Sequence, residues 1–218
     1  MSPLRAYVAL LLISVANDVL FWLTAERYAL LYFADVTVKV AMLALLLAAG
    51  THRLADPRPK ARPGPAALAA WFVFAAITHL AIVFTVNKIG EKWPLPYLFV
   101  WPRLGNSWLM VLDLTFGIAL SVTVEELMAR RLAWNVLQPR FVHAWQPLMI
   151  SSLLFGLGHW GRGPWNMIST TLVGMMLFMV YRRTGSLALV VAAHYFANLI
   201  VFAQWYGLAW YDLAFYFH

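Results

Sequence analysis

The chain has 218 residues, of which 63% are hydrophobic and 11% are charged, and its mean hydropathy is +0.72. A soluble domain carries about 25% charged residues, so this composition excludes a wholly water-facing surface and predicts a polytopic membrane protein. Cysteine is absent, which excludes disulfides, thiolate metal ligands and a cysteine nucleophile. The basic residues behind the net charge of +7 lie between apolar runs, so they indicate membrane topology rather than nucleic-acid binding.

The first apolar run covers residues 4–23 and is interrupted by Asn17 and Asp18. Its single basic residue, Arg5, followed by a hydrophobic stretch would also fit a cleaved signal peptide. No small-x-small cleavage site follows, and a second apolar run over 28–49 begins at once. We therefore expect a retained first span.

The second run contains Asp35 and Lys39, which are four residues apart and can pair along one helical face. We expect a buried structural pair here rather than a proton relay. A linker rich in proline and basic residues, 51–65, separates this run from a third span over 66–86. The following loop, 87–106, places aromatic residues among prolines, as is typical of an interfacial or re-entrant segment.

The second half of the chain begins with a fourth span near Ser107, followed by an interfacial turn within 131–146. Three further spans are expected at 147–160, 165–181 and 186–202. The last run, 205–218, is short enough to half-cross the membrane or to lie on its surface. The expected fold is an all-α transmembrane bundle of about seven to eight spans. It forms one domain, with variable spans and a loop over 1–106 and a helical core over 107–202.

The orientation follows from the basic residues in the loops. With a cytoplasmic amino terminus, ten basic residues face the cytoplasm: Arg5, Arg53, Arg58, Lys60, Arg62, Arg130, Arg131, Arg140, Arg182 and Arg183. Five fall on the opposite side: Arg27, Lys88, Lys92, Arg103 and Arg162. Cytoplasmic loops carry the excess of basic residues, so the amino terminus is expected in the cytoplasm.

Glu125, Glu126 and Arg130 stand at the end of a long apolar run. An ionisable group at membrane depth costs several kcal/mol unless it is paired or lines a wet cavity, so it indicates function. On a helix, Glu126 and Arg130 can pair because they are four residues apart. Glu125 is rotated by about 100° and is free to face something else.

Two later spans each carry a histidine. Phe155 and His159 share one helical face, and so do His194 and Asn198. At about 1.5 Å per residue, Glu125, His159 and His194 all lie roughly 12–17 Å from the cytoplasmic boundary. Taken singly, each of these groups is more often a cap, a packing residue or a helix–helix contact. Together, at one depth, they predict a wet polar cavity.

These three pieces resemble the EExxxR, FxxxH and HxxxN signatures of the CPBP (Abi) family of intramembrane endoproteases. That family includes the CAAX prenyl-protein protease of the Ras-converting type. The resemblance covers about residues 107–201, with the same order and spacing. Two positions depart from the pattern: Ala129 stands where the family usually has an aromatic residue, and Arg131 where it usually has glycine.

The resemblance implies that Glu125 is the general base that activates a water molecule, with His159 helping to bind that water. A carboxylate in a poorly hydrated site is suited to accepting and returning a proton. His194 and Asn198 would donate hydrogen bonds to the developing oxyanion. The supporting residues that would order the site are Glu126, Arg130 and Phe155.

Zinc is the alternative to a metal-free mechanism. Glu125, His159 and His194 form a ligand set that zinc accepts with an open fourth position. HExxH is absent, and no carboxylate lies next to either histidine to orient it, so we expect no metal cofactor. Serine and aspartyl proteases are not indicated, since their GxSx and GxGD signatures are missing.

The expected substrate is a membrane-anchored protein or peptide: a leader, a carboxy-terminal sorting signal or a CAAX-like tail. The lipid bilayer is the other expected partner, and nucleic acid is not. A non-catalytic scaffold or bacteriocin-immunity protein of the same family is an alternative, although all four catalytic positions are present. A proton-coupled transporter fits less well, because Asp18, Asp35 and Asp113 are scattered along the sequence. The short, compact chain favours a prokaryotic inner membrane.

Overall fold

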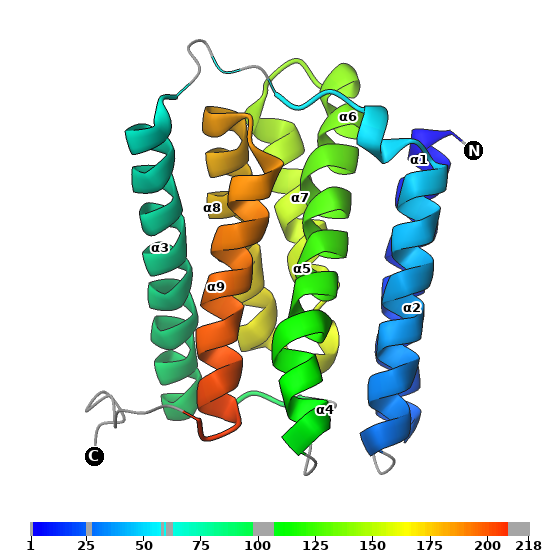
Figure 1. Cartoon of the computed structure of the whole chain (residues 1–218), viewed down its shortest axis with the longest axis vertical. Helices are drawn as coiled ribbons and strands as arrows, with labels where there is room; N and C mark the ends of the chain where they lie inside the picture. The colour runs from blue at the N-terminus through cyan, green and yellow to red at the C-terminus, as the bar shows by residue number, and fades with distance from the viewer. Residues whose placement is uncertain (1, 25–27, 58, 60–62, 98–106, 209–218) are drawn as a thin grey trace.

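The computed structural model describes residues 2–24, 28–57, 59, 63–97 and 107–208. All regular structure in these ranges is helical, which confirms the all-α expectation. Seven long helical rods stand side by side, if the consecutive segments from Ser107 to Arg140 are taken as one (Figure 1). By length and composition, four stretches of the described residues can cross a membrane: Pro3–Leu20, Pro65–Lys92, Trp108–Arg140 and Leu187–Trp205.

The first half of the chain forms α1 (Pro3–Thr24), α2 (Tyr28–Ala48), the 3-10 turn η1 (Thr51–Arg53) and α3 (Pro65–Lys92). Pro65 is the first residue of α3, where its missing N–H is not needed and its fixed φ suits a helix start. The third helix continues six residues beyond its expected end at 86, since the next proline after that point is Pro94. The Phe99, Trp101 and Pro102 part of the expected re-entrant loop lies outside the described residues.

The rod that carries the carboxylate pair is continuous but changes its winding twice. Its segments are α4 (Ser107–Leu112), the π-helix η2 (Asp113–Gly117), α5 (Ile118–Glu126), the π-helix η3 (Leu127–Leu132), α6 (Ala133–Leu137) and the 3-10 turn η4 (Gln138–Arg140). Single π turns inside α-helices are rare and recur at functional sites, since each one rotates the side chains that follow. Here the two π segments flank α5, which ends on Glu126.

The remaining rods are α7 (Trp145–Leu157), α8 (Pro164–Thr184) and α9 (Leu187–Trp205), with the 3-10 turn η5 (Trp160–Arg162) between the first two. Part of the expected last run, 209–218, lies outside the described residues. In Figure 1, α3 stands at one side of the molecule and α1 with α2 at the other, with α5, α7, α8 and α9 between them.

Two apolar clusters fill the bundle on either side of α5. One joins α1 and α2 to α5 and α6, and it includes Leu10, Leu46 and Leu132, all fully buried. The other joins α3 to α8 and α9, around Leu177 and Val190. The α5 helix therefore lies between the amino-terminal helix pair and the α3–α8–α9 group, and α9 packs directly against it.

The close packing of α7 against α8 depends on Gly156. A Cβ atom at this position would lie 1.8 Å from Thr171 Oγ1 and 2.7 Å from the Met167 carbonyl oxygen. Only glycine fits, so α7 packs tightly enough to hold the neighbouring Phe155 against the rest of the site.

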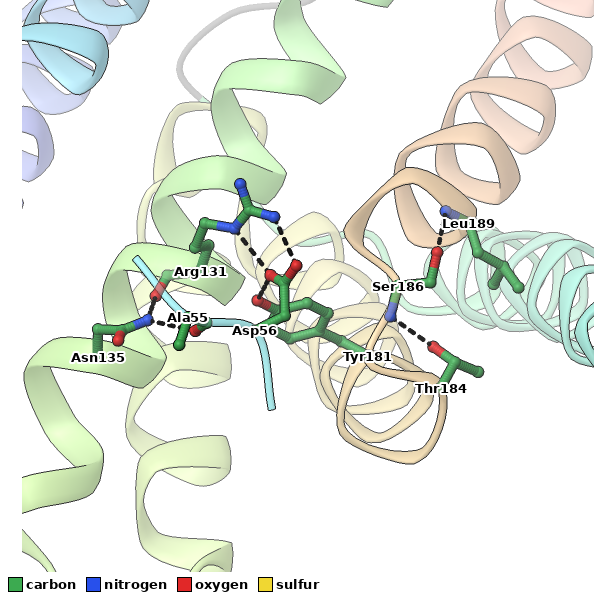
Figure 2. A network of polar contacts seen from close by, with 8 residues as sticks. All are labelled: Ala55, Asp56, Arg131, Asn135, Tyr181, Thr184, Ser186 and Leu189. Carbon is green, nitrogen blue, oxygen red and sulfur yellow. Dashed lines mark hydrogen bonds and ion pairs between the residues drawn. The ribbon is translucent and has the colours of Figure 1, made fainter. Parts of the chain in front are cut away.

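The α2–α3 linker forms ordered contacts with the end of the bundle (Figure 2). The Asp56 carboxylate accepts two hydrogen bonds from Arg131, from Nε at 2.8 Å and from Nη2 at 2.6 Å, and a third from the Tyr181 hydroxyl. Asn135 Nδ2 donates to the Ala55 carbonyl at 3.0 Å. We call residues 54–57 the strap, because they bind α8 and the η3–α6 rod together.

Candidate active site

One cavity of about 130 Å³ collects all four predicted catalytic side chains. Glu125 enters it from the end of α5, His159 from the turn after α7, and His194 and Asn198 from α9. The expected polar cavity inside the bundle is thus present, and three separate rods supply its four predicted catalytic side chains. Its further polar lining includes Asp35, Lys39, His79, Asp113, Arg162 and Asn166.

The expected pair of Glu126 and Arg130 forms at the bottom of this site. Arg130 Nε lies 2.9 Å from Glu126 Oε2, and both side chains are completely buried. Arg130 Nη2 also donates to Glu126 Oε1 at 3.3 Å. Losing either partner of this pair would be costly, because it would leave the other charge buried away from water.

Glu126 also orients His194, one of the two predicted catalytic histidines. His194 Nδ1 lies 2.8 Å from Glu126 Oε1, and His194 Nε2 lies 3.9 Å from Glu125 Oε2. With Glu126 ionised against Arg130, the Nδ1 proton of His194 is donated to the carboxylate. The two adjacent glutamates therefore address the two nitrogens of one imidazole, and Nε2 is the nitrogen left for chemistry.

The second histidine is oriented by a backbone carbonyl. His159 Nδ1 lies 2.8 Å from the Phe155 oxygen, which can only accept, so Nδ1 carries the proton and donates it. In the neutral ring, Nε2 then carries a lone pair that can accept a hydrogen bond from a water molecule. His159 lies just beyond the end of α7. It keeps the FxxxH spacing from Phe155 but is not part of the regular helix.

Phe155 occupies the centre of these contacts. Its ring centroid lies 4.9 Å from that of His159 and 6.4 Å from that of His194, and both pairs meet edge to face. The Arg130 guanidinium carbon lies 5.0 Å from the same centroid, within cation–π range. Beside it, Ser151 Oγ donates to the Ala129 carbonyl at 2.5 Å, which ties α7 to η3.

A second cavity, of about 210 Å³, meets the first at Glu125 and His159. Its other walls come from α1 and α2 and carry Asp18, Asp35 and Lys39. The expected Asp35–Lys39 pair is confirmed, with Lys39 Nζ 2.5 Å from Asp35 Oδ2, and Asn17 Nδ2 donates to Asp35 Oδ1 at 2.8 Å. Asp18, Asp35 and Asp113 are scattered along the sequence, yet helix packing brings Asp18 and Asp35 to this cavity and Asp35 and Asp113 to the first.

Arg130 and Arg162 also need correction as topology signals. Arg130 is fully buried, and Arg162 lines both cavities, so neither is an open loop residue. Without these two arginines, nine basic residues remain on the expected cytoplasmic side and four on the opposite side, so the cytoplasmic excess is still five.

Sequence reasoning missed His79 and one carboxylate contact. His79 lies in α3, far from the motifs, and its ring centroid is 5.1 Å from that of His194. A histidine within the apolar run over 66–86 was the available signal. The statement that no carboxylate orients a histidine was wrong for His194, since Glu126 packs against it across two helices.

The metal alternative can be examined through the ligand geometry. Glu125, His159 and His194 line one cavity, and both histidines have the hydrogen-bonded partners that metal ligands usually need. Within the described residues, however, no group of three or more His, Asp or Glu side chains is placed to hold a metal ion. The residue types suit zinc, and the expectation of a metal-free site stays a prediction.

The comparison with protein families agrees with the three motifs. Residues 106–200 match the family model of the type II CAAX prenyl endopeptidase Rce1-like proteins. We call this stretch the Rce1-like segment. The suspected family is thereby confirmed, and the match supports a CAAX-type membrane-embedded protease in general terms. No curated protein and no solved structure matches the chain.

The Rce1-like segment begins at the start of the π-wound rod and ends within α9, so it contains all three motifs. The strap and α1–α3 lie outside it. The chain is an integral membrane protein, as its long apolar helices and the match to a membrane-protease family indicate. Arg131, one of the two departures from the family pattern, donates two hydrogen bonds to Asp56 of the strap.

Proposed function

We propose that this protein is an intramembrane endopeptidase that hydrolyses a peptide bond in a membrane-anchored protein or peptide, using a water molecule activated by Glu125. The observation that carries the proposal is the convergence of Glu125, His159, His194 and Asn198 on one cavity. The Rce1-like match over the same residues supports the reaction class.

In this mechanism Glu125 takes a proton from water as the water oxygen attacks the scissile carbonyl carbon. The Glu125 side chain is a quarter exposed and faces both cavities, so water and substrate can reach it. His159 accepts a hydrogen bond from the same water through Nε2. When the C–N bond breaks, Glu125 returns its proton to the leaving amine, and no covalent intermediate forms.

His194 and Asn198 stabilise the oxyanion that develops on the carbonyl oxygen. Asn198 donates through its amide. His194 donates through Nε2 when its ring carries protons on both nitrogens, with Glu126 accepting from Nδ1. Preorganised donors of this kind are worth roughly 3–4 kcal/mol each in well-studied hydrolases.

The proposed substrate is a leader, a carboxy-terminal sorting signal or a CAAX-like tail, each held in the bilayer by its apolar or lipidated part. Short, compact architecture favours a prokaryotic inner membrane, and the excess of basic residues on one side favours a cytoplasmic amino terminus. Glu125 is then reached by a substrate that enters between the helices rather than from water.

The decisive experiment compares wild-type protein with Glu125→Gln. Membranes from cells that express each form are analysed by mass spectrometry for new protein termini, and purified protein in lipid vesicles is assayed with a farnesylated peptide that carries a CAAX tail. We expect cleavage in at least one assay, lost in Glu125→Gln at equal expression and equal melting temperature. Cleavage by Glu125→Gln at the wild-type rate, or no cleavage in either assay as a scaffold or immunity protein would give, overturns the proposal.

A further inference from the structure

One buried polar group in the cavity has no role in the mechanism above. His79 projects from α3, is 4% exposed and lines the cavity that holds the four catalytic residues. Its ring packs against that of His194, with centroids 5.1 Å apart and planes inclined by 53°. It lies outside the Rce1-like segment, so the family match assigns it nothing.

The nitrogen atoms of His79 differ in their surroundings. Nδ1 is enclosed and has no hydrogen-bond partner within the described residues. Since a buried donor without a partner is costlier than a buried acceptor, the neutral ring is expected to keep its proton on Nε2. Because Nδ1 is enclosed and the side chain lines the cavity, Nε2 is the nitrogen left to meet a ligand.

An apolar residue would pack at this position without the cost of an unpaired polar atom. Nδ1 stays without a partner among the described residues, so a histidine at this position is explained when a ligand in the cavity accepts a hydrogen bond from Nε2. The neighbours fix which part of the ligand this is. His194 lies on one side of His79, and Asn198 lines the same cavity one helical turn beyond His194.

We propose that His79 is a further catalytic residue, whose Nε2–H donates a hydrogen bond to the carbonyl oxygen of the scissile peptide bond. This inference rests on the proposed endopeptidase function and adds a third donor to those of His194 and Asn198. No proton is transferred: as water attacks, the carbonyl π electrons move to oxygen, and the Nε2–H bond stays intact while it stabilises the new charge. The donor comes from the amino-terminal half of the chain, so α3 becomes part of the catalytic machinery.

The test uses two variants of nearly equal shape. In His79→Gln, the amide nitrogen stands where Nε2 stands in histidine, whereas His79→Met fills the space without a donor. Kinetics are measured in lipid vesicles with the peptide that wild-type protein cleaves and Glu125→Gln does not. Val86→Ala, which removes buried volume from α3 at a position that lines neither cavity, serves as the packing control.

We expect His79→Met to lower kcat by about 10²-fold with KM unchanged, as for loss of one oxyanion donor. His79→Gln should recover most of that loss, and Val86→Ala should leave kcat near wild type. If His79→Met turns over at the wild-type rate while Glu125→Gln is inactive, this inference fails and the proposed function stands. If His79→Met and His79→Gln lose kcat equally at an unchanged melting temperature, the donor role is overturned as well. Absence of any Glu125-dependent cleavage overturns the proposed function itself.

Discussion

At the scale of single residues, Glu126 holds the site together although it does not face the reaction. Its carboxylate binds the Arg130 guanidinium and accepts a hydrogen bond from His194 Nδ1. The Arg130 and His194 side chains therefore share the two carboxylate oxygens of Glu126. Glu125, next to it, contacts the same imidazole from the other side at 3.9 Å. One glutamate thus fixes the ring that the other works beside, which explains why two adjacent carboxylates are needed.

This sharing predicts a stability effect. Glu126→Gln removes the negative charge and leaves Arg130 buried without its counterion, at a cost of about 3–5 kcal/mol. We expect a clear fall in melting temperature in detergent, together with loss of cleavage. The control is Glu91→Gln, the same change in the exposed Lys88–Glu91 pair, for which the expected loss is below about 1 kcal/mol. Equal melting of both variants would show that the buried pair contributes no more than a surface pair.

A second prediction at this scale concerns zinc. We expect the purified protein to keep its activity after treatment with a strong chelator and to contain no stoichiometric zinc. The reason is the arrangement of Glu125, His159 and His194, which line the cavity but are not grouped as ligands of one ion. Elemental analysis and the peptide-cleavage assay check this together. Activity that is lost on stripping zinc and regained on adding it back would require the zinc mechanism.

At the scale of elements, the sequence predicted what depends on local spacing. The Glu126–Arg130 and Asp35–Lys39 pairs follow from helical periodicity, and both form. The sequence did not predict contacts between distant segments. Asp56 contacts Arg131, 75 residues away in the sequence, and His194 contacts Glu126, 68 residues away. No periodic pattern encodes such pairs, because they depend on how whole helices pack.

The strap gives a prediction of this kind. Asp56 and Arg131 form a two-bond ion pair that is only partly exposed, with 30% and 18% of the side chains accessible. A double-mutant cycle with Asp56→Asn and Arg131→Gln should give a coupling energy of about 1 kcal/mol in thermal unfolding. Asn135→Ala, which loses only a neutral hydrogen bond to the same strap, should couple less strongly to Asp56→Asn. Strictly additive effects of Asp56→Asn and Arg131→Gln would mean that the strap rests on the bundle without stabilising it.

At the scale of the whole molecule, the Rce1-like segment supplies the motifs but not all of the walls. The second cavity is closed by α1 and α2, and the first is bounded on one side by α3. The strap lies across the end of the segment and links these outer helices to it (Figure 2). The amino-terminal half, which the motifs leave without a role, therefore shapes the space in which a substrate lies.

The arrangement of the ends also makes the membrane orientation testable. The strap, the end of α6 and the α8–α9 turn lie together at one end of the bundle, and the end of α3 lies at the other (Figure 1). Most basic loop residues belong to the first end, which the positive-inside rule places in the cytoplasm. Because the chain has no cysteine, single cysteines can report on each end without background.

We choose Ala55→Cys and Gln138→Cys for the first end and Lys92→Cys for the other, all at exposed positions. In intact cells, a membrane-impermeant maleimide should label Lys92→Cys and leave the other two unlabelled, because the bilayer blocks the reagent from the cytoplasmic side. After permeabilisation, all three should react, which controls for the accessibility of each thiol. The reverse pattern in intact cells would place the strap and the amino terminus outside. A substrate cleaved near the strap end would then have to be presented from the opposite face of the membrane.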